Sequence, residues 1–394
     1  MANSKKLLTY GQLIVKDLDK AYFLPHSRSS YCKDSKIYND KKYMHFDYPL
    51  KDSKEKDILR PIRHLATIGN AIPTLIDAKP DNLQSNHWKQ WLPGFPAAEV
   101  KSVKEGFADS IPVVSTGPLQ SLPDKKHAID PELHAELLCK STIPRIGVPT
   151  PRIMNEEDVS YPCMVKVDQS SGGCGNWLVH DSQELKEVVT KIRGKCNWKG
   201  KYILQEFIPD AETMGYYFYV FKSGDIHWLG SLTGAISKNF KWAAGVGNWN
   251  KQDELRKPVY EEFILPIKNF LHNSGYFGIV NIEILVDKEG RRYLVDLNCR
   301  LPGVLAQLFI APYMATLGYP ISLMTTSKVL TCTRKELFAM TEEINDQGRI
   351  GKVIVLAAAD VDGKFKADLA VFAETMAGIQ VLIDTLEQNN RKQQ

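Results

Sequence analysis

Short apolar runs, separated by polar and glycine-containing turns, recur through the middle of the chain. Apolar and polar positions that alternate with a period of two predict strands, and a polar turn between two such runs predicts an antiparallel hairpin. Two hairpins are predicted in this way, from 216–221 with 226–232 and from 278–286 with 292–297. Further strands are predicted at 161–167, 177–179, 202–208 and 351–359.

Helical periodicity lies between these strands. Asp130 can cap a helix and Pro131 is favoured in a first turn, so a helix is predicted from there to about Lys140. Two more helices are predicted at 182–192 and 258–274, where apolar positions recur three and four residues apart. Helices that alternate with short antiparallel groups of strands predict an α+β fold.

The first 115 residues are less regular. Runs at 64–76 and 111–115 predict helix and strand pieces of an α/β unit, and Trp88 and Trp91 are expected to close a small core rather than to bind a ligand. A length of 394 residues suits two or three domains. We divide the chain into the segments 1–120, 121–210, 211–330 and 331–394, the last of which completes the third or forms a small subdomain.

Composition narrows the class of protein. Hydrophobic residues make up 43% of the chain and charged residues 24%, which excludes a disordered or collagen-like chain. A net charge of +4 is too small an excess to indicate a nucleic-acid binder. Seven cysteines without a Cys-x-x-Cys pair predict neither a zinc site nor a disulfide framework, so a reducing cytoplasmic compartment is expected.

No membrane segment is expected. The N-terminus lacks the continuous apolar stretch of a signal peptide. Residues 301–327 carry no charge and are long enough to span a bilayer, but they contain Pro302, Pro312, Pro320 and several polar side chains. The prediction for this stretch is therefore a buried loop and helix.

The second hairpin carries the most informative polar side chains. Asp296, Asn298 and Arg300 fall at positions i, i+2 and i+4, so they point to one face, and Glu283 on the partner strand can face the same side. Such oxygen ligands suit Mg²⁺ that holds phosphate oxygens, and the guanidinium suits a further anion. A solvent-facing polar strand with salt bridges is the alternative, because this pattern is weak by itself.

A lysine on an apolar strand precedes a glycine-rich turn. Lys166 lies between two valines, so its ammonium group must reach an anion or extend to water. The segment 170–176, Ser-Ser-Gly-Gly-Cys-Gly-Asn, can expose consecutive backbone N–H groups to a phosphate. A turn that merely connects two strands is the alternative, because the sequence matches neither the P-loop nor the dinucleotide-binding fingerprint.

Two weaker signals flank this lysine. Lys140 falls at the predicted end of a helix, where it is either a partner of the helix dipole or a phosphate ligand. The segment 205–208, Gln-Glu-Phe-Ile, ends a predicted strand and could offer backbone groups to an adenine edge, with Glu212 available for ribose hydroxyls. An ordinary strand end is the alternative for this segment.

The order of these elements resembles the ATP-grasp superfamily. The lysines, the glycine-rich loop, the linker and the hairpin follow one another over about half of the chain, from Asp130 to Gly318. The sequence is similar to carboxylate–amine ligases of this group, such as D-alanine–D-alanine ligase, and more distantly to biotin carboxylase. The resemblance implies an ATP-grasp fold, α+β or α/β in class, that holds a nucleotide between two α+β subdomains and has an atypical N-terminal α/β domain.

The resemblance also implies roles for single residues. It assigns the phosphates of ATP to Lys140 and Lys166, and the loop over them to Ser171, Gly172, Gly173 and Gly175. It assigns the adenine to Gln205, Glu206, Phe207 and Ile208, and the ribose to Glu212. The implied Mg²⁺ ligands are Glu283, Asp296 and Asn298, and the implied catalytic residues are Arg300 and Lys166. Many relatives carry Glu where this chain has Asp296, a shorter carboxylate that binds Mg²⁺ but reaches two ions less readily.

The activity implied by this resemblance is amide or peptide bond formation. An acyl phosphate would form from ATP and a small molecule with a carboxylate, and an amine would then displace the phosphate. The substrates could be amino acids or peptides. The resemblance implies ATP and Mg²⁺, or Mn²⁺ in place of Mg²⁺, as cofactors. It is also compatible with a homodimer. An ATP-grasp carboxylase, an acyl-CoA synthetase-like enzyme and a non-catalytic nucleotide-binding regulator are the alternatives. Residues 237–250 either cover the acceptor pocket or form a surface loop with packed tryptophans.

Overall fold

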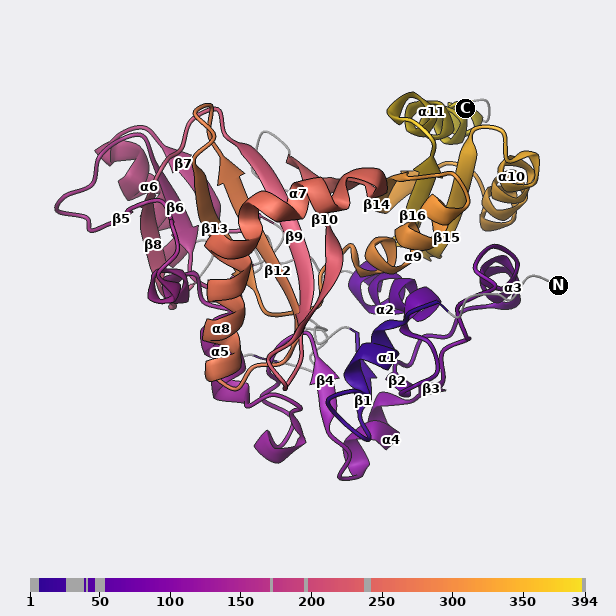
Figure 1. Ribbon diagram of the computed structural model, residues 1–394, viewed down its shortest axis with the longest axis horizontal. Helices are drawn as coiled ribbons and strands as arrows, with labels where there is room; N and C mark the ends of the chain where they lie inside the picture. Colours follow the sequence, from indigo (N-terminus) through magenta and orange to yellow (C-terminus); the bar gives the residue numbers. More distant parts are fainter. Residues whose placement is uncertain are drawn as a thin grey trace.

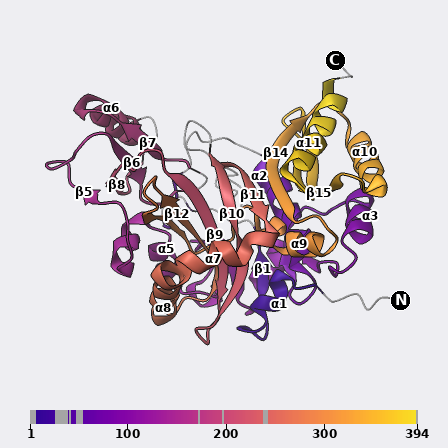
Figure 2. The ribbon, with the colours of Figure 1, turned by 45° about the horizontal axis from the view of Figure 1, so that its top comes forward.

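The computed structural model describes residues 7–25, 39, 42–46, 54–170, 173–194, 198–236 and 242–391. The strands in these residues form three sheets, of four, four and eight strands (Figure 1). Figures 1 and 2 show one small sheet at one end of the molecule and the C-terminal helices at the other, with the large sheet between them.

The first sheet is parallel and belongs to the N-terminal segment. Its strands are β1 (Tyr22–Leu24), β2 (Thr74–Leu75), β3 (Val100–Lys101) and β4 (Val113–Ser115), in the order β3-β2-β1-β4. The helices of this segment are α1 (Tyr10–Ile14), α2 (Lys54–Ile68), α3 (Asn82–Trp91) and α4 (Val103–Ala108). Parallel strands connected through helices confirm the predicted α/β unit.

Trp88 and Trp91 on α3 are structural residues, as predicted, but they contact a distant part of the chain. The indole N–H of Trp88 donates to the carbonyl of Val355 on β15 (Gly351–Val361), at 2.9 Å. The indole N–H of Trp91 donates to the carboxylate of Glu342 on α10 (Arg334–Gln347), at 2.7 Å. The two tryptophans therefore join the N-terminal segment to the C-terminal one.

The second sheet is antiparallel and forms the lobe at the left of Figure 1. Its strands are β5 (Ile153–Met154), β6 (Cys163–Val167), β7 (Asn176–Val179) and β8 (Tyr202–Glu206), in the order β5-β8-β6-β7, and α6 (Ser182–Arg193) follows β7. Buried side chains of β6, β7, β8 and α6 make a core of their own. This lobe supplies one wall of the site described below.

The helix predicted from Asp130 to about Lys140 is shorter than expected. It is α5 (Pro131–Leu137), and Lys140 instead begins a 3₁₀ helix, η2 (Lys140–Ile146). Asp168 explains the break: its carbonyl accepts the N–H of Lys140 at 2.9 Å, and its carboxylate accepts the N–H of Ser141 at 2.8 Å. These bonds draw the chain out of the α-helix and bring Lys140 to the end of β6.

The third sheet has eight strands and contains both predicted hairpins, β9 with β10 and β12 with β13. The strands of this sheet are β9 (Glu212–Val220), β10 (Ile226–Ile236), β11 (Trp242–Asn248), β12 (Gly278–Val286), β13 (Arg292–Asn298), β14 (Ile321–Leu330) and β16 (Lys364–Ala373), with β15 at one edge. Their order is β13-β12-β9-β10-β11-β14-β16-β15. Every pairing in this sheet is antiparallel.

Helices pack on this sheet. The helix predicted at 258–274 begins earlier, since α7 (Gln252–Val259), the π-helical turn η4 (Tyr260–Ile264) and α8 (Leu265–Asn273) follow one another directly. The uncharged stretch 301–327 contains the buried helix α9 (Leu305–Thr316), as predicted, and then enters β14. The last helix is α11 (Met376–Arg391). Among the described residues, no helix combines the length and apolar character needed to cross a bilayer.

Candidate functional site

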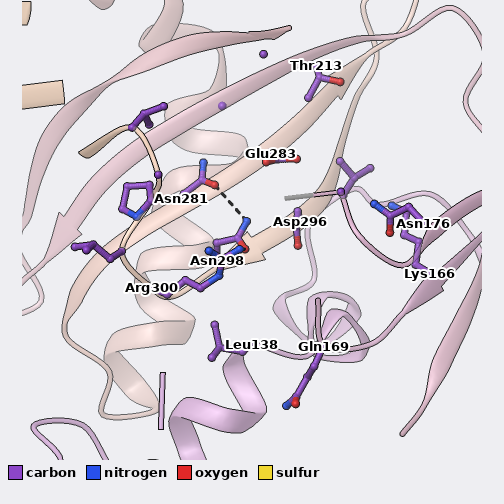
Figure 3. Close-up of a pocket in the computed structure, with 18 of the residues that line it drawn as sticks. Leu138, Lys166, Gln169, Asn176, Thr213, Asn281, Glu283, Asp296, Asn298 and Arg300 are labelled. Atoms are coloured by element: carbon purple, nitrogen blue, oxygen red, sulfur yellow. Dashed lines mark hydrogen bonds between the residues drawn. The ribbon is translucent and has the colours of Figure 1, made fainter. Parts of the chain in front are cut away.

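The second sheet, the third sheet and the N-terminal segment together enclose a cavity of about 650 Å³. Its lining includes residues from β6 and the end of β8, from β9, β12 and β13, and from α2. Residues 301–304, which follow the second hairpin, also line it. Figure 3 shows the polar side chains of this cavity converging from the strands of both sheets.

The floor of the cavity carries polar side chains in two rows. Strand β12 pairs with both β9 and β13, and residues opposite each other in antiparallel strands point to the same face. The rows are Gly215, Glu283 and Asp296, and next to them Tyr217, Asn281 and Asn298. Glu283 therefore lies on the same face as Asp296 and Asn298, as predicted, and a register shift between Glu283 and Ile284 places it there. Figure 3 shows Glu283 and Asp296 close to Asn281 and Asn298.

Glu283 and Asp296 face each other with few compensating contacts. In the part of the chain that the structure describes, the side chain of Glu283 makes no hydrogen bond or ion pair, and that of Asp296 has one ion pair, with Nζ of Lys140 at 3.9 Å. Burial, and then the negative charge of Asp296, raise the pKa of Glu283 to about 7. Two carboxylates in this state fit a divalent cation, because the cation would remove their repulsion.

A metal ion at this place would need further ligands. Across the described residues, no group of three or more His, Cys, Asp and Glu side chains could hold a metal ion. Asn298 lies beside the two carboxylates, but its Oδ1 already accepts a hydrogen bond from Arg300 at 2.7 Å, and its Nδ2 donates to Asn281 at 3.2 Å. Oxygen atoms of a bound ligand would therefore have to complete the coordination, as phosphate oxygens commonly do for Mg²⁺.

A buried histidine forms a hydrogen bond with the backbone between Asn298 and Arg300. Nε2–H of His134 on α5 donates to the carbonyl of Cys299 at 2.8 Å, and His134 is 3% exposed. Burial lowers the pKa of His134 to about 4. The neutral imidazole thus fixes the peptide that aims Arg300 into the cavity, and sequence reasoning missed it because the contact spans 165 residues.

We expect acid to destabilise the protein through His134. A folded-state pKa of about 4 is below the ordinary value of 6.5, so the unfolded chain binds more protons between these limits. The contribution of His134 to the free energy of unfolding is present above pH 6.5, and about 3 kcal/mol of it is lost as the pH falls to about 4. Urea unfolding across this range should show a smaller loss for His134→Gln, which keeps a donor but does not titrate. An equal loss in both proteins would contradict this role.

Lysines approach the carboxylates from the second sheet. Lys166 on β6 lines the cavity and is 8% exposed, and its side chain makes no hydrogen bond or ion pair within the described ranges. Burial is the main cause that lowers its pKa, to about 8, and the positive charge of Lys140 adds to this. Lys140 does not line the cavity; its Nζ donates to Oγ of Ser170 at 3.0 Å. The unpartnered ammonium of Lys166 is therefore suited to an anionic ligand.

The other predicted site residues fall in different places. Gln205, Glu206, Phe207 and Ile208 all line the cavity, together with the apolar side chains Met164, Leu285 and Val295. Glu212 is exposed at the start of β9 and is not part of the lining, although Thr213 beside it is. An apolar slot next to a strand end is suited to a flat aromatic ring.

The glycine-rich segment is only partly described. Ser171 and Gly172 lie outside the described residues. Gly173 lines the cavity and has a φ of +75°, a conformation that glycine adopts without strain. Gly175 has the same φ but does not line the cavity. A Cβ added at Gly175 would come within 3.0 Å of the side chains of Phe46 and Val167. Gly175 thus serves packing, whereas the amide of Gly173 remains a candidate ligand contact.

Sequence reasoning did not select several residues that line the cavity. Asn281 and Tyr217 belong to the second row of the floor, and Tyr217 is 7% exposed without a hydrogen bond in the described chain. The alternation rule that linked Asp296 to Asn298 would also have selected Asn281, two residues before Glu283. Nothing in the sequence pointed to Tyr217, because its place depends on the pairing of β9 with β12.

Comparisons with known proteins agree on one group. Residues 145–298 match the family model described as L-aspartate–L-methionine ligase, ATP grasp. The chain is 27% identical to the formate-dependent phosphoribosylglycinamide formyltransferase of Ignicoccus hospitalis over 178 residues. The match covers 40% of this chain and 42% of that protein. It is 22% identical to the chloroplastic biotin carboxylase 1 of Populus trichocarpa over 181 residues. That match covers 41% of this chain and 33% of that protein. The chain thus spans less than half the length of these curated relatives.

A solved structure extends the likeness beyond the matched segment. The N5-carboxyaminoimidazole synthetase from Staphylococcus aureus, solved in complex with ADP, superposes with a TM-score of 0.50 at 11% identity. The superposition covers 80% of this chain and 91% of that one. The likeness shows that the two chains share a fold, over more of this chain than the family model covers.

Proposed function

We propose that the chain, which belongs to the ATP-grasp superfamily and has its fold, is an ATP-dependent ligase that joins the carboxylate of one small molecule to the amine of another. One observation carries the proposal: two facing carboxylates and an unpartnered buried lysine, from two different sheets, share one cavity. The family model over 145–298 supports amino acids as the substrate class.

In this proposal the nucleotide lies between the two sheets. The adenine occupies the apolar slot beside 205–208, and Lys166, with Lys140 behind it, holds the phosphates. Glu283 and Asp296, with Asn298 beside them, would hold Mg²⁺, which when bound neutralises charge on the phosphate oxygens. A nucleotide-binding regulator would have no need for two carboxylates that repel each other, so this pair favours an enzyme.

The proposed reaction has two steps. An oxygen of the substrate carboxylate attacks the γ-phosphorus of ATP, the bond to the β–γ bridging oxygen breaks, and an acyl phosphate and ADP form. The amine nitrogen then attacks the acyl carbon, phosphate leaves with its electron pair, and the nitrogen loses a proton to give the amide. Lys166 and Arg300 stabilise the negative charge of the transferred group, which is the main task of a protein in phosphoryl transfer.

The nucleotide product tests this mechanism. We expect ADP and phosphate, in a one-to-one ratio with an amide product, when ATP, Mg²⁺ and pairs of amino acids are screened by mass spectrometry. With an ¹⁸O-labelled carboxylate substrate, one labelled oxygen should appear in the released phosphate, because the acyl carbon–oxygen bond breaks in the second step. AMP and pyrophosphate would contradict an acyl phosphate, and ADP release that depends on bicarbonate would indicate a carboxylase instead.

A further inference from the structure

Tyr217 on β9 carries a hydroxyl that the roles given above to the other site residues leave unused. Its side chain lines the cavity and is 7% exposed. Its hydroxyl forms no hydrogen bond with another residue in the part of the chain that the structure describes. A buried hydroxyl costs free energy unless it finds a hydrogen-bond partner, so this hydroxyl is suited to a molecule bound in the cavity.

Gly215 lets the ring of Tyr217 lie along the floor of the cavity. A Cβ added at Gly215 would come within 2.9 Å of the Tyr217 hydroxyl oxygen and within 3.1 Å of Cε2 of the ring. The ring therefore leans along β9, and its hydroxyl lies above the row that Gly215 forms with Glu283 and Asp296. On the other side of β9, Gly215 pairs with Leu232 of β10. The hydroxyl is thus flanked by an apolar side chain on one strand and by a carboxylate on the other.

The carboxylates separate two ends of the cavity. Along β12, Leu285, Glu283 and Asn281 point to one face, from the proposed adenine slot across to the opposite end. Figure 3 shows Glu283 between Lys166 on one side and Asn281 on the other. The nucleotide would reach Glu283 from the end that Leu285 and Lys166 border. The molecule that receives its phosphate would therefore lie at the other end, which Asn281 and Tyr217 border.

Space for this molecule lies beside the hydroxyl. Gly234 on β10 and Gly245 on β11 are opposite each other, and both line the cavity. A Cβ added at Gly245 would come within 3.2 Å of Leu232, so a side chain there would take up this space. Two facing glycines on neighbouring strands thus keep the floor next to Leu232 clear for the body of a small carboxylic acid.

We propose that Tyr217 is a catalytic residue whose hydroxyl donates a hydrogen bond to the carboxylate that receives the phosphate. The proposal rests on the proposed function and adds a residue to its mechanism. One carboxylate oxygen attacks the γ-phosphorus, and the hydroxyl holds the other oxygen, which becomes the carbonyl oxygen of the acyl phosphate. A phenol keeps its proton at neutral pH, so Tyr217 serves as a neutral donor.

The same hydrogen bond acts again in the second step. When the amine nitrogen adds to the acyl carbon, an electron pair of the carbonyl bond moves to the oxygen, which becomes negatively charged. It returns when phosphate leaves, and Tyr217 keeps its proton throughout. A hydrogen bond to an oxyanion is stronger than one to a neutral carbonyl, so a donor placed there lowers the barrier of this step. Loss of the hydroxyl should therefore slow amide formation more than ADP release.

Tyr217→Phe tests the role of the hydroxyl by kinetics. We expect amide formation to slow by about 100-fold, as for loss of one oxyanion donor, with the KM of ATP unchanged. The acyl phosphate that accumulates would react with water, so the ratio of amide to released ADP should fall below one. Tyr216→Phe, at a buried position outside the cavity lining, is the matched control. Amide formation as fast as in this control, or a ratio that stays at one, would overturn the proposal.

Gly215→Ala tests the position of the hydroxyl. The added methyl group would meet the hydroxyl oxygen and displace it, so amide formation should slow here too. In the Tyr217→Phe background the same change should cost little more, because the hydroxyl is already absent. A full further loss in that background would contradict this placement of the hydroxyl, since the methyl group would then block the cavity by itself.

Stability and binding measurements keep this test separate from the test of the function. Tyr217→Phe should resist urea at least as well as the wild type, because it removes no hydrogen bond within the described chain. Thermal shifts with the common amino acids, in the presence of MgADP, should reveal an acid that stabilises Tyr217→Phe less than it stabilises the wild type and Tyr216→Phe.

The two proposals can then fail independently. A wild type that binds such an acid but releases no ADP would contradict the proposed function and support the hydrogen bond from Tyr217. If every acid that stabilises the wild type stabilises Tyr217→Phe equally, the hydrogen bond is overturned, whether or not the protein is a ligase.

Discussion

Asp296→Asn and Glu283→Gln should each reduce substrate-dependent ADP release by about 100-fold or more, the typical cost of removing one preorganised charge contact. Each change keeps the volume of the side chain and removes one negative charge from the facing pair on β12 and β13. If the two carboxylates hold the same Mg²⁺, the double variant should lose little more ADP release than either single variant, because the two residues act as a unit.

The measurement is ADP release as a function of Mg²⁺ concentration in the two single variants and the double variant. Glu289→Gln is the matched control, since it makes the same change at an exposed position in the turn of the same hairpin. Arg300→Lys should also lose activity, because an ammonium cannot replace a planar guanidinium with several fixed donors. Turnover near that of the wild type in both carboxylate variants would favour a merely polar hairpin and remove the main support for the ligase.

Lys166→Met should abolish tight ATP binding and, at the same time, make the folded protein more stable. Burial lowers the pKa of Lys166 to about 8, so at neutral pH the folded chain keeps a charged group in a poorly solvated place. The shift from the ordinary value of 10.5 corresponds to a cost of about 3 kcal/mol. Methionine fills a similar volume without this cost.

The pH dependence of this gain gives a second readout. The folded-state pKa is below the unfolded value, so the cost of burying Lys166 is fully present below about pH 8 and disappears as the pH rises above 10.5. Denaturant unfolding at pH 7 and at pH 10.5 should therefore show a larger stabilisation by Lys166→Met at the lower pH. Lys268→Met on α8, which lies outside the lining of the cavity, is the control for ATP binding. A Lys166→Met variant that is less stable than the wild type, yet whose folded fraction keeps its ATP affinity, would make Lys166 a structural residue.

Patterns within single hairpins and helices were predicted well from the sequence. The alternation in 292–298 determined that Asp296 and Asn298 share a face, whereas Glu283 lies opposite Asp296 because the register of the hairpin shifts between Glu283 and Ile284, which the sequence did not indicate. The capping residues at Asp130 and Pro131 located the start of α5 for the same local reason. The order of lysines, glycine loop and hairpin indicated the superfamily and its fold.

Only the tertiary structure decided which of these residues meet. Lys140 comes within 3.9 Å of Asp296 because Asp168 holds the backbone that follows α5, and Lys166 and Glu283 share one cavity because two separate sheets enclose it. His134 supports the carbonyl of Cys299 across 165 residues. Such contacts depend on packing between elements that no local pattern encodes, so the sequence by itself determined the strands, the turns and the chemical groups, and the fold decided their partners, their burial and their pKa values.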